Sequence, residues 1–353
     1  MNKKWKMWVG WIFLMALTAY VVLMSTVEIS FTSENFPLSK KWSTRLSSSI
    51  QQISIINNQI VLVRTEAEIY ALEVKSGNLL WHRYTNWRAG GNEPALAKNG
   101  IVFFTDSKWV WALNQSDGEV LWQQKLHEQS AKIVDVSADM VAVFDWQQIF
   151  VYKATDATLL LQEPVCRNSY LAHINNSNLY YLCSGIIAVS IDTGETLWEI
   201  KENSASTAAT YSDGVLYADL FVDVITAFDL EKQNKIWRTP LPSGQVREIK
   251  VTDEFLLVSG GNYFCVLQRQ DGKKLWCTDS AIAQQNPAKL GDAVYLLKST
   301  NNIITAFDIH SGSELGLLKM SKFKPLITFG QLMVSSDELL IFANGKEIFA
   351  YGK

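Results

Sequence analysis

The sequence predicts an all-β fold, an eight-bladed β-propeller closed by its N- and C-terminal strands and preceded by one N-terminal transmembrane helix. Three observations lead to this expectation. A hairpin-like motif that ends in Trp recurs about every 40 residues, each period holds about four strand-like runs, and one long uncharged segment precedes the first motif. The 353 residues are 48% hydrophobic and 19% charged, which suits an ordered protein with a sizeable core.

The repeat is clearest when it is measured at the last residue of the motif. Six tryptophans occupy this position: Trp42, Trp81, Trp122, Trp198, Trp237 and Trp276. Leu161 and Gly316 take the same place in two weaker copies, and the successive steps are 39, 41, 39, 37, 39, 39 and 40 residues. A small residue precedes this position by ten and a turn residue by four, as Ala71 and Gly77 precede Trp81. The motif therefore reads as two strands joined by a tight turn.

Each period also contains two further strand-like runs. After Trp237 the four runs are "REIKV", "EFLLVSG", "YFCVLQ" and "KKLWCT". Four strands in about 40 residues are typical of a propeller blade. Runs such as "IVFFT" and "LYYLC" are apolar at consecutive positions, which indicates sheets covered on both faces. A long sandwich, the alternative architecture, would not keep such a period.

The two ends of the chain predict how the ring closes. The C-terminal "IFAYGK", 348–353, begins a motif but lacks its second strand, and "LSKKW", 38–42, supplies one. Seven complete units and one shared unit make eight blades, and closure removes the exposed edges of an open array. We therefore expect a propeller over 38–353 and a linker over 28–37.

The N-terminal 27 residues are expected to form a transmembrane anchor or signal-anchor. Lys3, Lys4 and Lys6 precede twenty uncharged residues, 8–27, which is enough to span a bilayer. The basic flank predicts a single-pass protein of the cell membrane with its propeller on the extracytoplasmic side. A cleaved signal peptide is the alternative, although "LTAY" and "LMST" fit a cleavage site poorly. No Cys follows the apolar run, so a lipid anchor is not expected.

The cysteine positions predict two disulfides in an exported chain, Cys166–Cys183 and Cys265–Cys277, because each pair falls at one end of neighbouring strands. The four histidines are scattered over different segments, so no metal site is expected. The net charge of -3 gives no basic face for nucleic acid.

The motif Ala-x-Asp-x-x-Thr-Gly-x-x-x-Trp, written here as "AVSIDTGETLW" and "ALNQSDGEVLW", resembles the tryptophan-docking repeat of PQQ-like, quinoprotein-type β-propellers. The resemblance extends over about 42–353, and it implies that the junctions marked by Leu161 and Gly316 are the loosest. Quinone enzymes of this class hold their cofactor with two adjacent cysteines and bind calcium through Glu, Asn and Asp. This chain has no Cys-Cys pair, so we expect no cofactor, no metal and no enzymatic activity.

Relatives without cofactor act as protein scaffolds, and one of them is the propeller subunit of the outer-membrane β-barrel assembly machine, a lipoprotein. The resemblance therefore implies a membrane-tethered, non-catalytic scaffold that binds a protein partner, with envelope protein assembly as one setting. Two alternatives are a carbohydrate or cell-wall binding module and a quinone-dependent dehydrogenase. The repeated tryptophans are assigned to packing between blades and not to ligand stacking.

Partner binding is expected on the face opposite the Asp-Gly turns, which holds the longer and more varied loops. Aromatic, arginine and acidic side chains outside the repeat positions are the candidates. They are Tyr84, Trp87, Arg88, Asp106, Trp109, Asp145, Trp146, Phe221 and Asp223. The other interpretation, solvated loops whose aromatic residues pack against the rim, stays open for each of them.

Overall fold

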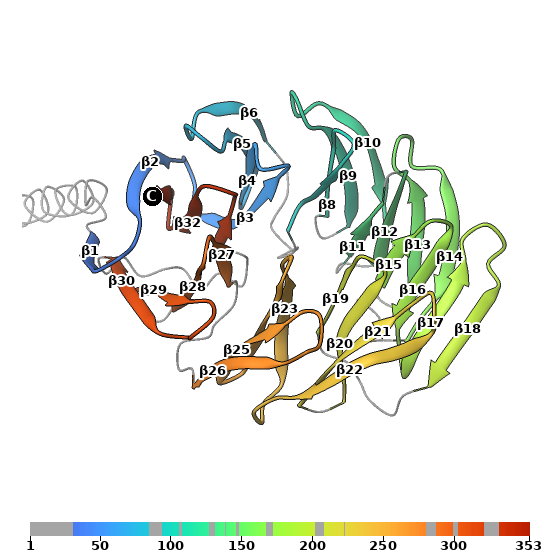
Figure 1. Cartoon of the computed structure of the whole chain (residues 1–353). Coiled ribbons are helices and arrows are strands. Elements are labelled where there is room, and N and C mark those ends of the chain that lie inside the picture. The colour runs from blue at the N-terminus through green and yellow to red at the C-terminus, as the bar shows by residue number, and fades with distance from the viewer. Residues whose placement is uncertain are drawn as a thin grey trace, which may run out of the picture.

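The computed structural model describes residues 31–84, 94–105, 108–126, 131–137, 139–145, 148–166, 172–201, 208–221, 223–279, 287–298, 303–320 and 332–353. These residues form eight antiparallel sheets arranged as blades around a central axis (Figure 1). No helix within these ranges has the length and apolar character needed to cross a membrane. The transmembrane segment expected over 1–27 lies outside the described residues.

The first four blades follow one another along the chain, and each contributes four consecutive strands. Blade one holds β3 (Ile50–Ile56), β4 (Ile60–Thr65), β5 (Glu68–Glu73) and β6 (Leu79–Tyr84). Blade two holds β7 (Leu96–Lys98), β8 (Ile101–Thr105), β9 (Trp109–Asn114) and β10 (Val120–Lys125). Blade three holds β11 (Lys132–Val136), β12 (Met140–Asp145), β13 (Gln148–Lys153) and β14 (Leu159–Pro164). Blade four holds β15 (Ala172–Asn175), β16 (Asn178–Leu182), β17 (Gly185–Ser190) and β18 (Thr196–Lys201).

The last four blades include both segments that come from the N-terminus. Blade five holds β19 (Ala209–Ser212), β20 (Val215–Phe221), β21 (Val224–Asp229) and β22 (Asn234–Pro240). Blade six holds β23 (Val246–Val251), β24 (Phe255–Gly260), β25 (Tyr263–Gln268) and β26 (Lys274–Asp279). Blade seven holds β27 (Ala288–Leu290), β28 (Ala293–Lys298), β29 (Ile303–Asp308) and β30 (Glu314–Met320), with β1 (Phe31–Glu34) added as a fifth strand. Blade eight holds β31 (Met333–Ser335), β32 (Leu340–Asn344), β33 (Glu347–Gly352) and β2 (Ser39–Arg45).

The expected ring closure is confirmed. Strand β2 pairs antiparallel with β33, and Trp42 lies opposite Ala350 as the repeat predicts. The expected linker over 28–37, in contrast, is in part a strand, since Phe31–Glu34 pairs with the outer edge of β30. That edge carries buried apolar side chains, Leu318 and Met320, so a covering strand keeps it from water.

The core lies between the blades and not inside any one of them. Each sheet is buried on both faces, as all six residues of β4 illustrate. One hydrophobic cluster, for example, joins Phe103 and Trp122 of blade two to Ile133 and Val143 of blade three. The first strands of neighbouring blades contact one another, as β11 and β15 do, and therefore surround the axis. The consecutive apolar runs of the sequence follow from this two-sided burial.

The repeated Trp and Gly form one interlocking contact between successive blades. The indole Nε1 of Trp81 donates a 2.8 Å hydrogen bond to the backbone oxygen of Gln115 in the next blade. The ring lies over Gly118, where a Cβ would approach Cε3 of Trp81 to 2.5 Å. Gly118 thus supplies both a left-handed turn, φ 71°, and the space for the ring. The same indole bonds are Trp42 to Val74, Trp122 to Ala154, Trp237 to Arg269 and Trp276 to Ile309.

Candidate functional site

The strand order gives the propeller two different faces. One, the turn face, carries the turns between the first and second and between the third and fourth strands of each blade. The other, the loop face, carries the loops between the second and third strands and the connections between blades. The partner candidates that the structure describes lie at or next to strand ends on the loop face: Tyr84, Trp109, Asp145, Phe221 and Asp223.

The structure separates these candidates into different environments. Tyr84 ends β6 and is 77% exposed. Trp109 is half-buried, with Nζ of Lys125 5.9 Å from its ring and the ring of Trp111 6.3 Å away. Phe221 ends β20, and its side chain is not described. Trp87, Arg88, Asp106 and Trp146 lie outside the described residues.

The two remaining acidic candidates have internal positions. Asp145 ends β12 opposite Gln148 and is only 4% exposed, so the expectation that it contacts a partner is corrected by its burial. Its charge contributes, after burial, to raising the pKa of Tyr152 to about 12. Asp223 accepts a 2.9 Å hydrogen bond from the backbone nitrogen of Gly244, and it thereby ties the loop after β20 to the connection between blades five and six.

Tyr84 belongs to a polar and aromatic group that we call the blade-one cluster: Ser47, Glu68, Tyr70, His82 and Tyr84. The ring of His82 stacks on Tyr70 with 5.0 Å between centroids, and the ring of Tyr84 meets His82 edge-on at 4.9 Å. The three rings therefore form a ladder that begins at a buried tyrosine and ends at an exposed one. Aromatic pairs in these geometries stabilise one another beyond the area that they bury.

The carboxylate of Glu68 anchors the ladder at its buried end. It is 6% exposed, accepts hydrogen bonds from the hydroxyls of Ser47 (2.5 Å) and Ser48 (3.2 Å), and lies 3.4 Å from Nε2 of His82. Burial raises the pKa of Glu68, but the hydrogen bonds to Ser47, Tyr70 and Ser48 and the proximity of His82 together hold it below its usual value. Glu68 is therefore ionised at neutral pH and fixes the orientation of the side chains around it.

The sequence alone does not reveal this anchor. Ser47 lies in the connection after β2, whereas Glu68 and His82 belong to β5 and β6. Only the closure of the ring brings blade eight beside blade one. The one signal in the sequence is a Tyr-x-x-Trp-Arg stretch, 84–88, that departs from the repeat positions.

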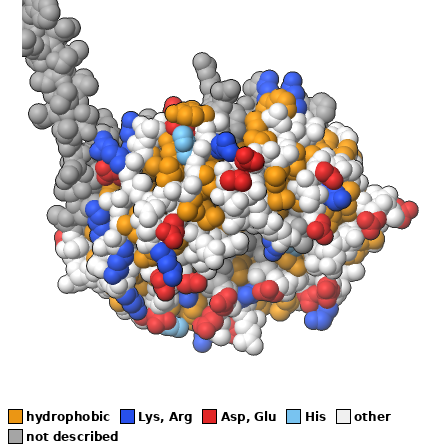
Figure 2. All heavy atoms as spheres, turned by 90° about the horizontal axis from the view of Figure 1, so that it is seen from above, with side chains coloured by type: hydrophobic (Ala, Val, Ile, Leu, Met, Phe, Trp, Pro, Cys, Tyr) orange, Lys and Arg blue, Asp and Glu red, His pale blue; other side chains and the backbone are white. Residues whose placement is uncertain are grey.

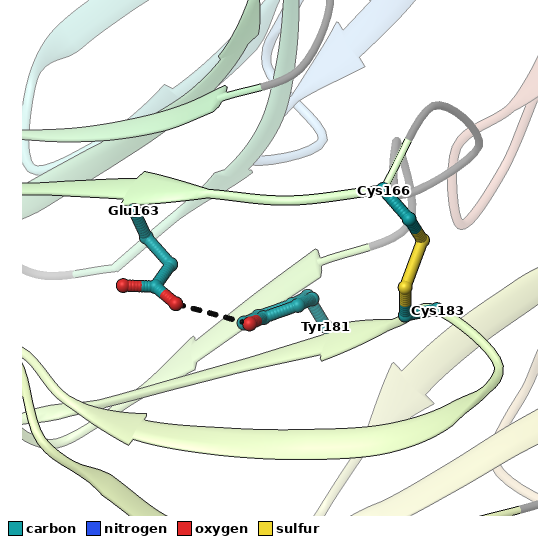
Figure 3. Close-up of a disulfide and its surroundings, with 4 residues drawn as sticks. All are labelled: Glu163, Cys166, Tyr181 and Cys183. Atoms are coloured by element: carbon teal, nitrogen blue, oxygen red, sulfur yellow. Dashed lines mark hydrogen bonds between the residues drawn. A yellow bond between two sulfur atoms is a disulfide. The ribbon is translucent and has the colours of Figure 1, made fainter.

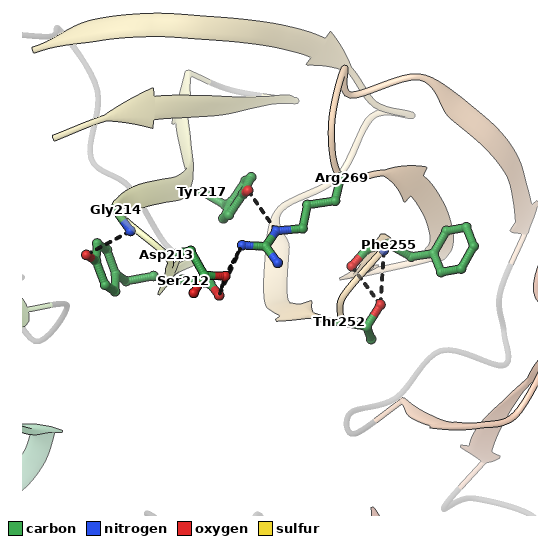
Figure 4. A network of polar contacts seen from close by, with 8 residues as sticks. Ser212, Asp213, Gly214, Tyr217, Thr252, Phe255 and Arg269 are labelled. Atoms are coloured by element: carbon green, nitrogen blue, oxygen red, sulfur yellow. Dashed lines mark hydrogen bonds and ion pairs between the residues drawn. The ribbon is translucent and has the colours of Figure 1, made fainter. Parts of the chain in front are cut away.

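The turn face carries a hollow that is lined by residues of blades five, six and seven. Its volume is about 710 Å³, and its lining includes Trp237, Phe255, Arg269 and His310. Figure 4 shows the guanidinium of Arg269 directed toward Asp213 and Tyr217, with Nη2 2.5 Å from a carboxylate oxygen of Asp213 and Nε 3.1 Å from the tyrosine hydroxyl. These contacts join blade six to blade five. The hydrogen bond from Arg269 also lowers the pKa of Asp213.

The outer strands carry the remaining exposed apolar side chains. Figure 2 views the molecule from the side on which β6 and β10 lie, and it shows hydrophobic side chains interspersed with acidic and basic ones. The exposed residues on three successive outer strands are Leu79, Leu80, Val120, Leu121, Leu159 and Leu160. Within the described ranges, no group of three or more His, Cys, Asp or Glu side chains could hold a metal ion.

Comparison with known proteins identifies relatives across most of the chain. A family model described as outer membrane protein assembly factor BamB matches residues 65–164 and 183–348. Outer membrane protein assembly factor BamB of Yersinia pestis is 21% identical over 342 residues, which cover 89% of this chain and 73% of that protein.

Two solved structures show the same fold. The crystal structure of BamB from Moraxella catarrhalis matches with a TM-score of 0.69 and 16% identity, covering 90% of this chain and 98% of that one. A computationally designed protein, Ika8, matches with a TM-score of 0.67 and 16% identity, covering 88% and 98%. At 16% identity both matches show a shared fold.

Proposed function

Because this chain belongs to the family described as outer membrane protein assembly factor BamB, we propose that it is a non-catalytic scaffold that binds a protein partner during the assembly of outer-membrane proteins. We further propose that the uncharged segment 8–27 tethers the propeller to the membrane on its extracytoplasmic side. Tethering raises the effective concentration of the propeller near a membrane-bound partner, so a modest affinity suffices.

The exposed ring of Tyr84 is the observation that carries this proposal. An aromatic side chain that is 77% exposed yet packed edge-on against His82 is already restrained before a partner arrives. Ordering a free side chain on binding costs about 0.5–1.5 kcal/mol, and pre-organisation reduces that cost. Tyrosine is also enriched among the residues that dominate interface energies.

The position of Tyr84 at the end of β6 supports a contact on the loop face at blade one. The chain continues from Tyr84 directly toward Trp87 and Arg88, which lie outside the described residues and remain proposed contacts. Trp109 in the neighbouring blade two adds a half-buried aromatic ring with Lys125 over it. We propose that these four side chains form the interface.

Site-specific crosslinking tests the proposed face. A photo-crosslinking amino acid at position 84 of the full chain, in the native cell envelope, should form an adduct with a component of the outer-membrane protein assembly apparatus. The matched control places the same group at Val120, which is 53% exposed on an outer strand next to a turn of the opposite face. Equal recovery of the same adduct from position 120 would contradict the assignment of the loop face.

Substitution tests the energetic role of the ring. Tyr84→Ala should weaken binding of the crosslinked partner by roughly 30-fold, the effect of an interface residue worth about 2 kcal/mol. The melting temperature should stay unchanged, because the side chain is exposed and its loss opens no cavity. Undiminished binding by Tyr84→Ala would exclude this residue as the anchor.

Membrane extraction tests the tether separately. The full chain should remain in the membrane pellet after washing at alkaline pH, whereas a chain lacking residues 1–27 should appear in the supernatant. A mature protein whose N-terminus begins near residue 28 would show that the segment is a cleaved signal peptide and would overturn the tether without affecting the proposed interface.

A further inference from the structure

A second cavity opens at the centre of the ring, away from the proposed interface. Its volume is about 270 Å³. Residues of the innermost strands of blades two to five line it, including Leu96, Asp135, His173 and Tyr211. Its apolar wall extends between blades four and five, where Leu182, Ile186, Leu216 and Leu230 line it.

The junction between blades four and five, which borders this cavity, differs from the junction at Trp81. Trp198 is half-buried and packs near Tyr180 and Phe228, but its indole makes no hydrogen bond to another described residue. The corresponding turn position in blade five is Gln233, which adopts φ 55°, where blades one, two, four, six and seven have glycine and blade three has Ala157. Among the described residues, the outer end of this junction therefore lacks the indole hydrogen bond and the glycine of the Trp81 junction. The cavity lies at its inner end.

An Asp–His pair stands at the polar end of the cavity. Asp135 and His173 hold the same repeat position in successive blades. Asp135 lies opposite Ala142, which lies opposite Val151 of the third strand of blade three. His173 lies opposite Tyr180, which lies opposite Ala188 of the third strand of blade four. Nδ1 of His173 is 2.6 Å from Oδ2 of Asp135. That oxygen also accepts a bond from the backbone nitrogen of Ile174 at 2.7 Å. The other oxygen, Oδ1, accepts one from Val136 at 2.8 Å.

The pair fixes the hydrogen-bonding character of the imidazole. The carboxylate oxygen accepts from Nδ1–H, so in the neutral imidazole Nε2 presents a lone pair. Nε2 has no hydrogen-bond partner among the residues that the structure describes, and the His173 side chain remains 20% exposed. The ring of Tyr211 stacks on the imidazole at 3.4 Å between centroids and holds its plane. The cavity therefore offers one positioned acceptor beside aromatic and apolar walls.

We propose that this cavity binds a small monocyclic aromatic compound that carries a hydroxyl group, a phenol, whose hydroxyl donates to Nε2 of His173. The volume supports a ligand of this size, because an apolar cavity of about 150 Å³ holds benzene. The walls supply apolar and aromatic contact for the ring, and the Nε2 acceptor favours a ligand that carries a donor. An anionic ligand is disfavoured at this position, because the carboxylate of Asp135 is adjacent.

The test compares phenol with toluene, which has the same ring and no donor, on the purified full-length chain. With histidine rings labelled with ¹³C, the His173 signal should shift saturably with phenol. Toluene should bind about tenfold more weakly, the effect of one hydrogen bond to a positioned acceptor. Equal affinities for the two compounds, or no saturable shift of the His173 signal with phenol, would overturn the proposal.

Two variants and one control distinguish the effect of the His173 acceptor from the effect of the cavity volume. His173→Phe should remove the preference for phenol over toluene, whereas His310→Phe, the same change in a turn outside this cavity, should keep it. Ala209→Phe should block both compounds, because Ala209 lines the cavity. A preference for phenol that survives in His173→Phe, or that is lost equally in His310→Phe, would overturn the assignment. If circular dichroism shows that His173→Phe does not fold, the comparison of phenol with toluene on the unaltered chain still decides.

Discussion

Different contacts close two junctions of the ring, the one between blades one and two and the one between blades three and four. At the first, the Trp81 ring covers Gly118 and its Nε1 binds the oxygen of Gln115. At the second, Leu161 replaces the tryptophan, and the atom nearest to a Cβ at Gly194 is 3.7 Å away. The glycine is kept although the ring that needed the space is absent.

A covalent link and a hydrogen bond close this second junction instead. Figure 3 shows the disulfide Cys166–Cys183 next to Glu163 and Tyr181, whose side chains point toward each other. Cys166 follows the last strand of blade three and Cys183 follows β16 of blade four. The hydroxyl of Tyr181 donates to Glu163 at 3.1 Å across the same junction. The docking tryptophan is therefore one of several contacts that can close a junction between blades.

The junction after blade seven illustrates a third closure. A Cβ at Gly316 would lie 2.3 Å from the backbone oxygen of Asn35, so the chain that follows β1 occupies the place of the missing ring. Phe36 then packs between Tyr295 of blade seven and Tyr351 of blade eight, at 5.9 and 6.0 Å between centroids. The two junctions expected to be loosest from their missing tryptophans thus each have a substitute.

The largest expected effect separates the two glycines of the first comparison. Gly118→Ala should lower the free energy of unfolding by about 3–4 kcal/mol, because the methyl group meets the Trp81 ring and the residue has φ 71°. Gly194→Ala has the same backbone strain, φ 73°, without the clash, and should lower it by about 1 kcal/mol. Urea unfolding of both variants measures the difference. Equal losses would mean that the Trp81 ring does not need the space.

The disulfide at the second junction should have the next largest effect. Cys166→Ala with Cys183→Ala, which opens a loop of sequence separation 17, should lower the free energy of unfolding by about 3 kcal/mol. Hydrogen exchange should increase on both sides of the junction, in β14 and β16. Cys265→Ala with Cys277→Ala is the matched control, since that disulfide joins two paired strands of blade six. Faster exchange confined to one blade in both variants would contradict a role in joining blades.

The sequence predicted what every blade needs, but of the contacts that join particular blades it predicted only the Cys166–Cys183 disulfide. Positions such as Ala71, Gly77 and Trp81 recur because burial and turn geometry demand them in each unit, so the repeat predicted eight blades and their closure. The four residues of β1 carry no repeat signal, and only the apolar edge of β30 makes them a strand. The blade-one cluster and the Asp135–His173 pair depend on contacts between blades, which spacing along the chain does not display.

The closure by the N-terminal segment should contribute less than the disulfide. Phe36→Ala should lower the free energy of unfolding by about 2 kcal/mol, because a half-buried aromatic ring leaves two tyrosine contacts. Tyr84→Ala, which removes an exposed aromatic ring, is the control and should change the free energy little. Chemical denaturation of the two variants side by side measures this. A loss for Phe36→Ala no greater than for Tyr84→Ala would show that the segment after β1 does not close the junction.

The smallest expected effect is a gain, and it asks whether the two closures of the first comparison are interchangeable. Leu161→Trp places the missing ring over Gly194, which still has φ 73° and no Cβ. The indole Nε1 should then donate to the backbone oxygen of Ile191, the position that corresponds to Gln115 at the Trp81 junction. The added hydrogen bond should raise the free energy of unfolding by up to about 1 kcal/mol.

In the chain without the Cys166–Cys183 disulfide the gain should be larger, since the two closures act on one junction and neighbouring changes do not add independently. Equal gains in both backgrounds would show that the ring and the disulfide stabilise the blades separately, and a loss in both would show that the leucine junction has no room for the ring.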